Sequence, residues 1–327
     1  MQIGNVKLPI PVILAPMAGV TDYPFRKIVN HFGAGLVYSE MVASRAIMEA
    51  LKNTKVRKRL HFFDASIEPY LVSMQIVGND PEIMADAARF SEQLGATCVD
   101  INMGCPVKKV VNIDCGAALM KDEALAAKIL RAVVAAVRIP VTVKMRLGWD
   151  FQHINVIELA KMAENEGVCA VAVHGRTRSQ FYEGTANWQI ISEVKQSLKI
   201  PVIGNGDVKD IFGASELLKS CNAVMIGRGA CGRPWLLRQV AAHLDNAQIP
   251  KQCNIQVLDT IHSHLALILE TYGEDKGTRL ARKHLDWYSK GYPGAAAFRS
   301  TVNSEVTASG MYALVDEFFS GLVAHES

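Results

Sequence analysis

The sequence predicts an α/β fold, a (β/α)8 TIM barrel followed by a small all-α C-terminal domain. Eight short β-rich runs alternate with stretches that have helical patterning, which is typical of parallel βαβ units that close into a barrel. Past about residue 247 the alternation stops and only helical patterning follows. At 327 residues the chain also exceeds the roughly 250 residues that a barrel alone requires.

The predicted elements follow in chain order. Strands are expected at 11–16, 36–42, 71–77, 97–102, 140–145, 170–173, 201–203 and 223–226. Crossover helices are expected between them, for example at 81–94, 123–137, 155–166 and 188–198. Four more helices are expected at 253–272, 278–290, 295–304 and 309–322. We therefore divide the chain into a barrel domain, 1–247, and a helical domain, 248–327.

Composition limits the class of protein. Half of the residues are hydrophobic and a fifth are charged, so the chain can bury a full core. The seven cysteines are scattered without a C-x-x-C pair, which argues against a disulfide framework and a thiolate zinc site and favours a reducing cytoplasm. No apolar run is long enough to span a membrane, and the proline-broken N-terminus makes a poor signal peptide. A net charge of +3 permits a nucleic-acid partner only if the basic residues are clustered.

Polar or small residues follow each predicted strand. Because a TIM barrel gathers the C-terminal ends of its strands at one mouth, we expect these residues to line a single pocket. They are Pro16, Met17, Ala18, Gln75, Asn102, Cys105, Lys144, Arg146, His174, Arg176, Asn205, Gly206, Asp207, Gly227 and Arg228.

Two glycine-containing loops follow the last two strands, at 204–207 and 227–229. Each could simply permit a tight turn, but barrels commonly hold a phosphate on the backbone N–H groups at these two positions. Two adjacent loops, one of them carrying Arg228, favour the phosphate site.

The other strand ends indicate what the phosphate belongs to. Lys144 could form a Schiff base, bind a carboxylate or neutralise negative charge on a flavin ring. The Gln75 amide both donates and accepts hydrogen bonds, which suits the mixed edge of a flavin, and the turn at 16–19 offers a flat floor. Together these features favour flavin mononucleotide (FMN). Cys105 alone could be a proton donor, a nucleophile or a small buried residue.

The motifs in combination resemble the tRNA-dihydrouridine synthases over essentially the whole chain. They stand at 15–22, 102–106, 144–146, 174–177 and 205–207, and the segments 282–284, 287–288 and 298–299 resemble the bacterial B subgroup. The resemblance implies that FMN, reduced by NADPH or alternatively NADH, gives hydride to C6 of a tRNA uridine. Cys105 would then protonate C5 as an acid, without a metal. The subgroup points to a D-loop uridine, with position 17 as the first candidate.

The resemblance also implies residue roles. FMN would be bound by Pro16, Met17, Ala18, Gln75, Lys144, His174, Asn205, Gly206, Asp207, Gly227 and Arg228. The flipped pyrimidine would be held by Asn102, Arg146, Arg176 and Arg178. The tRNA would lie on the basic cluster of the helical domain, namely Lys276, Arg279, Arg282 and Lys283, with Trp287 and Tyr288 beside it. A second basic run at 52–59 could extend this surface or be a solvated helix face.

Two alternatives stay open at this stage. One is an FMN-dependent dehydrogenase of free pyrimidines, such as a dihydroorotate dehydrogenase, and the other is an RNA-binding barrel without catalysis. We expect a cytoplasmic monomer. No G-x-G-x-x-G motif follows a strand, so the sequence does not indicate where the nicotinamide cofactor approaches.

Overall fold

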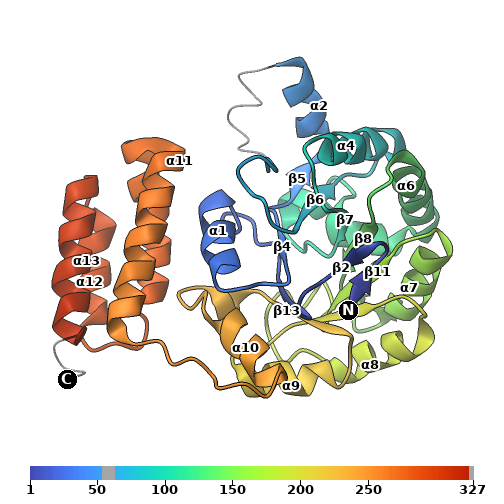
Figure 1. The fold of residues 1–327 in the computed structure, drawn as a ribbon. Coiled ribbons are helices and arrows are strands. Elements are labelled where there is room, and N and C mark those ends of the chain that lie inside the picture. Colours follow the sequence, from blue (N-terminus) through green and yellow to red (C-terminus); the bar gives the residue numbers. More distant parts are fainter. Residues whose placement is uncertain (54–62, 324–327) are drawn as a thin grey trace.

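Eight parallel strands close into a barrel in the computed structural model, which describes residues 1–53 and 63–323 (Figure 1). Strand β13 pairs with β3, and β4 pairs with β6, so the parallel ladder runs all the way around. Each of the eight predicted strands overlaps one of these, which confirms the predicted fold class. The barrel strands are β3 (Val12–Leu14), β4 (Leu36–Tyr38), β6 (Val72–Val77), β7 (Cys98–Met103), β8 (Val141–Met145), β11 (Ala170–His174), β12 (Val202–Asn205) and β13 (Ala223–Ile226).

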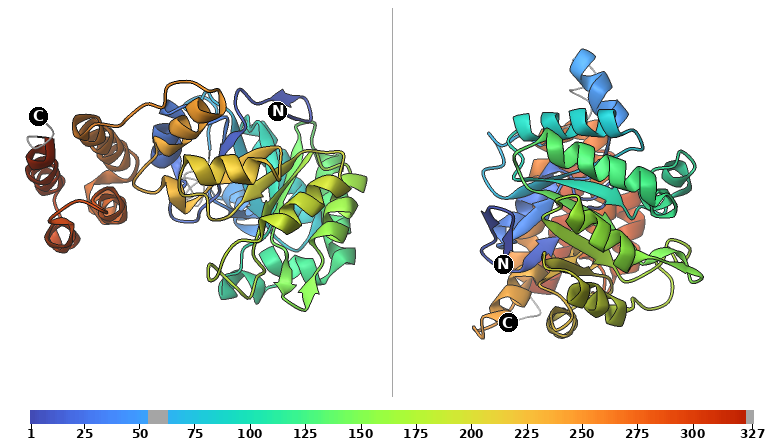
Figure 2. Two further views of the ribbon diagram at one scale, coloured as in Figure 1. Left: turned by 90° about the horizontal axis from the view of Figure 1, so that it is seen from below. Right: turned by 90° about the vertical axis from the view of Figure 1, so that its right-hand side faces the viewer.

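Helices surround the barrel (Figures 1 and 2). Several begin at an aspartate whose side chain accepts a hydrogen bond from the first turn, as Asp80 and Asp122 do, which satisfies backbone groups that a helix start leaves unpaired. These helices are α1 (Tyr23–His31), α2 (Ser44–Lys52), α4 (Pro81–Gln93), α6 (Glu123–Ala136), α7 (Val156–Asn165), α8 (Trp188–Ser197), α9 (Ile211–Leu218) and α10 (Leu236–Leu244).

A short N-terminal hairpin, β1 (Gln2–Ile3) and β2 (Val6–Lys7), covers the N-terminal end of the barrel. Ile3 and Leu8 are buried against inward-facing side chains such as Ile13 and Leu36. Because this end is filled by apolar contacts, polar chemistry is restricted to the opposite end, where the strands finish.

Some short elements differ from the prediction. The expected strand 36–42 ends at Tyr38, and a separate strand, β5 (Val42–Ala43), pairs with β6 beyond it. A hairpin of β9 (Gly148–Asp150) and β10 (His153–Ile154) follows β8, and a short helix, α5 (Lys108–Val111), with two 3₁₀ turns, η1 (Gly116–Lys121) and η2 (Arg228–Ala230), lies in the loops. All are too short to produce a clear hydrophobic period.

The C-terminal region is helical, as predicted. Element α11 (Asn254–Tyr288) is broken at Gly273, whose φ of 73° is left-handed, so it consists of two arms in place of one straight helix. The arms pack closely, since a Cβ on Gly277 would lie 3.2 Å from the Leu269 Cα. Helices α12 (Ala295–Ser304) and α13 (Ala308–Val323) complete the region. The division at residues 247 and 248 stays a prediction.

The helical region packs against α1 of the barrel (Figures 1 and 2). Ile28 and Phe32 of α1 share a hydrophobic cluster with Leu285 of α11. At the edge of this contact the Tyr272 hydroxyl donates to Asp22 at 3.0 Å, and Lys283 donates to the Gly19 carbonyl. The segment 16–22 at the barrel mouth therefore contacts the helical region directly.

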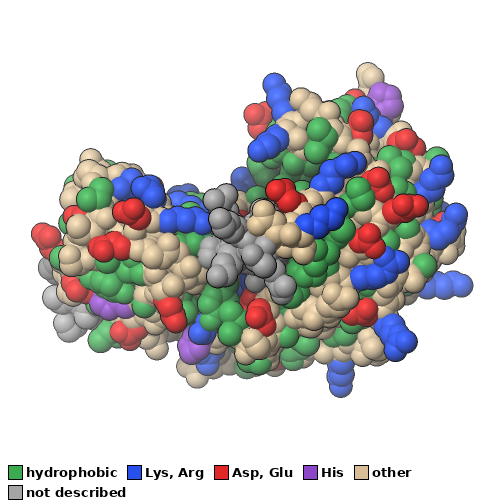
Figure 3. All heavy atoms as spheres, turned by 90° about the horizontal axis from the view of Figure 1, so that it is seen from above, with side chains coloured by type: hydrophobic (Ala, Val, Ile, Leu, Met, Phe, Trp, Pro, Cys, Tyr) green, Lys and Arg blue, Asp and Glu red, His purple; other side chains and the backbone are tan. Residues whose placement is uncertain are grey.

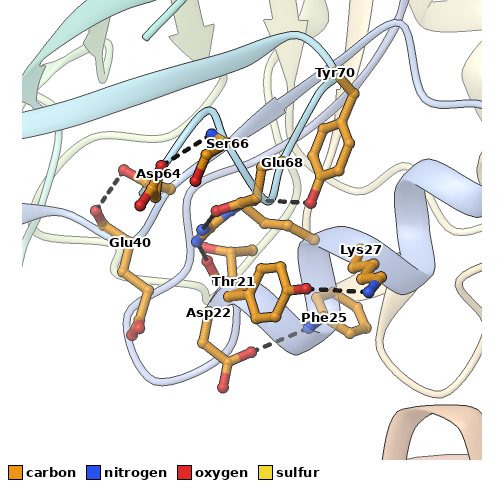
Figure 4. Close-up of polar contacts among 12 residues, drawn as sticks. Thr21, Asp22, Phe25, Lys27, Glu40, Asp64, Ser66, Glu68 and Tyr70 are labelled. Carbon is orange, nitrogen blue, oxygen red and sulfur yellow. Dashed lines mark hydrogen bonds and ion pairs between the residues drawn. The ribbon is translucent and has the colours of Figure 1, made fainter. Parts of the chain in front are cut away.

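A buried ion pair holds the same segment from the barrel side (Figure 4). Arg26 of α1 pairs with Glu68 with both side chains almost fully buried, and its Nη1 donates to the Thr21 carbonyl at 2.8 Å. The Tyr70 hydroxyl also donates to Glu68, at 2.8 Å. Asp22 caps α1 by accepting from the Phe25 N–H at 3.1 Å, so the segment is held by hydrogen bonds at both Thr21 and Asp22.

Candidate functional site

The predicted strand-end residues do gather at the C-terminal mouth of the barrel. Strand register places Asn102 beside Lys144 and His174 beside Asn205, so side chains from four neighbouring strands lie together. The site can therefore be described as one group of interacting residues.

Lys144 stands on β8, between Asn102 of β7 and His174 of β11. Its Nζ donates to the Asn205 Oδ1 at 3.1 Å. Burial lowers the pKa of Lys144 from 10.5 to about 8, nearby Arg146 lowers it further, and the Asp100 carboxylate opposes both. The ammonium is therefore charged at neutral pH and available to an electron-rich ligand.

Cys105 follows β7 and is half-buried. Its backbone N–H donates to the Asn102 Oδ1 at 2.9 Å. Burial raises the pKa of its thiol above the ordinary value, and a backbone hydrogen bond from Val107 and the charges of Arg146 and Lys144 oppose this only in part. A thiol that keeps its proton at neutral pH suits an acid better than a nucleophile.

A chain of hydrogen bonds leads from the barrel interior to Cys105. The fully buried Asp100 accepts from Thr142 at 2.6 Å and from Gln75 Nε2 at 2.7 Å. Gln75 Oε1 in turn accepts from Asn102 Nδ2 at 2.8 Å. Asp100 was not predicted as a site residue because it lies inside the apolar run 97–102 and not at the strand end. A carboxylate in such a run is the signal that could have found it.

Arg146 and Arg176, expected to hold the substrate, are largely engaged with the protein. Arg146 donates to the carbonyl oxygens of Gly104, Thr177 and Phe181 at 2.7 to 2.9 Å. Arg176 pairs with Asp207 at 2.7 Å and donates to two carbonyls of the loop after β11. Their observed role is to tie neighbouring loops together, and contact with a substrate stays a prediction.

His174 is buried beside four cations. Burial and the charges of residues such as Lys144 and Arg146 hold its pKa well below the usual range, so the ring is neutral. Arg176 Nη1 lies 3.3 Å from Nε2. Since a guanidinium can only donate, Nε2 accepts and Nδ1 carries the proton.

The two glycine loops, whose role in holding a phosphate stays a prediction, differ in how closely their glycines are packed. Gly206 has φ 120°, and a Cβ there would come within 2.7 Å of Ala186 and 3.0 Å of the His174 ring. Gly227 lies beside the barrel floor, and the Arg228 guanidinium carbon, in the same loop, lies 4.4 Å from the centre of the Tyr182 ring. Tyr182 was missed because it stands in an irregular loop without a motif.

The residues Pro16 to Ala18, expected to bind FMN, and Arg178, expected to hold the pyrimidine, contact different parts of the protein. In the floor segment, Pro16 to Ala18, the Met17 N–H donates to Thr21 at 3.0 Å, which stabilises the turn. Arg178 instead stacks on Trp149 of β9, with its guanidinium carbon 4.4 Å from the ring centre.

The basic cluster of the helical region is only partly free. Lys276 and Arg279 are exposed, but Arg282 donates to the Glu305 carbonyl at 2.7 Å and Lys283 to Gly19. Figure 3 shows Lys and Arg side chains on both sides of the hollow between the helical region and the barrel.

The predicted RNA surface also included Tyr288 and the second basic run. Tyr288, expected beside the basic cluster, is buried and hydrogen-bonds to His264, so it is not available to an RNA base. In the second basic run, residues 54–59 lie outside the described residues.

Two further observations concern the described residues, 1–53 and 63–323. None of their helices combines the length and apolar character that crossing a membrane requires. They also contain no group of three or more His, Cys, Asp or Glu side chains placed to hold a metal ion.

Solved structures share the barrel. Morphinone reductase matches with a TM-score of 0.53 at 13% identity, over 79% of this chain and 91% of that one. An old yellow enzyme homologue from Zymomonas mobilis matches with a TM-score of 0.51 at 14% identity, over 79% and 94%. At these identities the likeness concerns the fold.

Sequence relatives are much more similar. A "Probable tRNA-dihydrouridine synthase" of Rickettsia bellii is 46% identical over 100% of both chains. Proteins described as "tRNA-dihydrouridine synthase B" are 47% identical in Xanthomonas campestris pv. campestris, over 99% of this chain and 97% of that one, and 44% identical in Pseudomonas aeruginosa, over 98% and 96%. The family model "Dihydrouridine synthase (Dus)" matches residues 13–321. The chain belongs to the dihydrouridine synthase family.

Proposed function

We propose that this protein reduces a uridine of tRNA to 5,6-dihydrouridine, with FMN as its cofactor and NADPH as the reductant. The observation that carries the proposal is the Cys105 thiol, which keeps its proton and stands beside Asn102 and Lys144 at the barrel mouth. The names of the relatives support the same activity.

The residues at the mouth fit FMN. Lys144 supplies a positive N–H donor suited to the electron-rich N1 and O2 edge of the ring, and Gln75 lies beside the same site. Gly227 and the exposed Arg228 of the loop after β13 would hold the phosphate of FMN, with the loop at Gly206 beside them. When bound, FMN supplies the hydride that goes to C6 of the uracil ring.

The chain itself provides the proton and the enclosure. Cys105 holds its proton on Sγ and would deliver it to C5 of the uracil. Asn102 fixes the backbone of that cysteine, at 2.9 Å from its N–H. Arg146 binds the loops after β7 and β11 to each other, which fixes the rim of the mouth on the side of Cys105.

RNA reaches this site as an extruded base, because a stacked uridine cannot enter a barrel mouth. Lys276 and Arg279 are exposed on the helical region and would contact backbone phosphates. The finer parts of the proposal are a D-loop target, position 17 first, a cytoplasmic monomer, and NADPH in preference to NADH.

The proposal is tested with the purified full chain. We expect a yellow protein whose flavin is FMN, and dihydrouridine formed in unmodified tRNA transcript when NADPH is added. Mapping dihydrouridine in tRNA from cells with and without the gene identifies the position. Reduction of free orotate or uracil without reduction of tRNA would support a free-pyrimidine enzyme, and a colourless protein that binds tRNA would support an RNA-binding barrel.

A further inference from the structure

We propose that Asp100 is a positioning residue for the acid, because its buried carboxylate orients Gln75 and, through Gln75 and Asn102, the backbone of Cys105. That Asp100 acts in catalysis rests on the proposed function, whereas the orientation of Gln75 and Asn102 rests on hydrogen-bond geometry. No role follows for Asp100 from the mechanism described above, although it lies one layer beneath the site.

The buried carboxylate of Asp100 acts only as a hydrogen-bond acceptor. Asp100 has no exposed surface, and its two oxygens accept from Thr142 Oγ1 at 2.6 Å and from Gln75 Nε2 at 2.7 Å. Although burial raises its pKa to about 6, the group is ionised at neutral pH and can only accept hydrogen bonds. The titratable groups that face it are Lys144 from β8, Tyr38 from β4 and Cys98 from its own strand.

The orientation of Gln75 depends on this acceptor. An amide presents two N–H donors on one side and an oxygen on the other, and either side could face inward. The carboxylate of Asp100 requires the nitrogen, so Oε1 of Gln75 turns to Asn102 and accepts from Nδ2 at 2.8 Å. Gln75 is itself 1% exposed, so no bulk water competes for this arrangement.

Asn102 connects the orientation of Gln75 to the backbone of Cys105, the proposed acid. With Nδ2 of Asn102 directed at Gln75, its Oδ1 is left to accept from the N–H groups of Gly104 at 3.1 Å and Cys105 at 2.9 Å. A reversed Gln75 would place its nitrogen against the Asn102 nitrogen, and an Asn102 that also reversed would turn its nitrogen toward those N–H groups. The buried charge at one end and the two backbone N–H groups at the other end thus favour the same direction for every hydrogen bond in the chain.

The same orientation affects the bound ring. Gln75 uses one hydrogen of its amide nitrogen for Asp100, and the second hydrogen is a donor that the reverse orientation would replace by an acceptor. Lys144 is also a donor at this mouth. Asp100 therefore favours a ligand edge that accepts hydrogen bonds.

Three variants distinguish the loss of the hydrogen-bond acceptor at residue 100 from a change in side-chain packing. Asp100→Ala removes the acceptor that faces Gln75. Asp100→Asn keeps an oxygen for Gln75 and can donate to Thr142, whose hydroxyl can also accept, so the direction is preserved. Thr142→Val removes the other partner of the same carboxylate and leaves the chain to Cys105 intact, which makes it the matched control.

Two measurements are made on each folded variant. One is the FMN dissociation constant, from quenching of flavin fluorescence, and the other is the iodoacetamide alkylation rate of Cys105, from peptide mass spectrometry. The exposed Cys253 serves as the internal reference. We expect Asp100→Ala to weaken FMN binding about tenfold, the effect of losing one buried hydrogen bond, and to speed alkylation of Cys105 several-fold. Asp100→Asn and Thr142→Val should stay within about twofold of the wild type.

Unchanged FMN binding and alkylation in Asp100→Ala would overturn the proposal, as would equal changes in Thr142→Val. If Asp100→Ala does not fold, Gln75→Met interrupts the chain one step later and should speed alkylation of Cys105 in the same way. An unchanged rate in that variant overturns the proposal too. If the wild type binds no FMN, the proposed function fails, whereas the alkylation rates still decide the role of Asp100.

Discussion

Replacing Cys105 by alanine tests the proposed acid most directly. The variant removes the Sγ proton but little volume from a half-buried position, so we expect it to fold and to keep the Asn102 hydrogen bond, which uses the backbone N–H. FMN should still bind and accept hydride from NADPH, because Lys144 and the glycine loops are unchanged. Formation of dihydrouridine should fall steeply.

The size of the fall follows from the role of the group. Positioned general acids contribute about 10²- to 10⁴-fold to a rate. Since burial raises the pKa of the Cys105 thiol, more than about nine-tenths of it is protonated near neutral pH, and the wild type uses nearly the whole contribution. We therefore expect tRNA reduction by the variant to be at least about 100-fold slower.

The assay is single-turnover oxidation of the reduced enzyme by tRNA, followed by flavin absorbance and by mass spectrometry of nucleosides. Cys115→Ala is the matched control, because it makes the same change in the loop that follows Cys105, at a thiol bonded to the Ile113 carbonyl. That variant should react at a rate close to wild type. Normal reduction of tRNA by Cys105→Ala would refute the assignment.

Three further predictions concern charge. Because the pKa of Lys144 is lowered to about 8, its ammonium is lost as pH rises through 8, so FMN binding, followed by fluorescence titration, should weaken above that pH and do so far less in Lys144→Arg. Lys276→Glu and Arg279→Glu should each weaken tRNA binding, measured by filter binding. Each should also reduce by about 1 the steepness with which the logarithm of the association constant falls with the logarithm of the salt concentration. Arg26→Met leaves the buried Glu68 carboxylate without its cationic partner and should lower the free energy of unfolding in urea by about 3–5 kcal/mol.

These variants have controls of their own. Lys128→Glu makes the same charge reversal on the exposed face of α6 and should leave tRNA binding unchanged. The double variant Arg26→Met/Glu68→Leu removes both charges and should be more stable than Arg26→Met alone. A pH profile of FMN binding that is the same in wild type and Lys144→Arg would contradict the reasoning about the ammonium.

The barrel was predictable because its signal is periodic. Each strand is a short apolar run followed by a polar end, and the eight runs predict both the closure of the barrel and the convergence of residues as separate as Asn102 and Asn205. The break near Gly273 was also predictable, since the helical pattern pauses between 272 and 278. Strands of two residues, such as β5, were not, because such a run has no period to detect.

The partners of the site residues could not be read from sequence. Arg146 and Arg176 were expected to face the substrate because they are cations at strand ends, yet most of their N–H groups meet carbonyl oxygens or Asp207. A sequence shows that a cation stands at the mouth but does not show which loop carbonyls will lie within 3 Å of it. Asp100 was not predicted for a different reason. Its position within a strand is clear from the sequence, but its importance depends on which side chains donate hydrogen bonds to its carboxylate.

The mouth and the helical region are joined through one short segment, 16–22. Its first residues are predicted to form the floor of the site, Asp22 caps α1, and Gly19 contacts both Glu40 of the barrel and Lys283 of the helical region. Tyr272 adds a second bond to Asp22, at 3.0 Å. If this segment forms the floor and the helical region binds RNA, as proposed, these few residues would determine the distance between bound RNA and the thiol. A change in the packing of the helical region should therefore alter the reaction at Cys105 even when both surfaces remain intact.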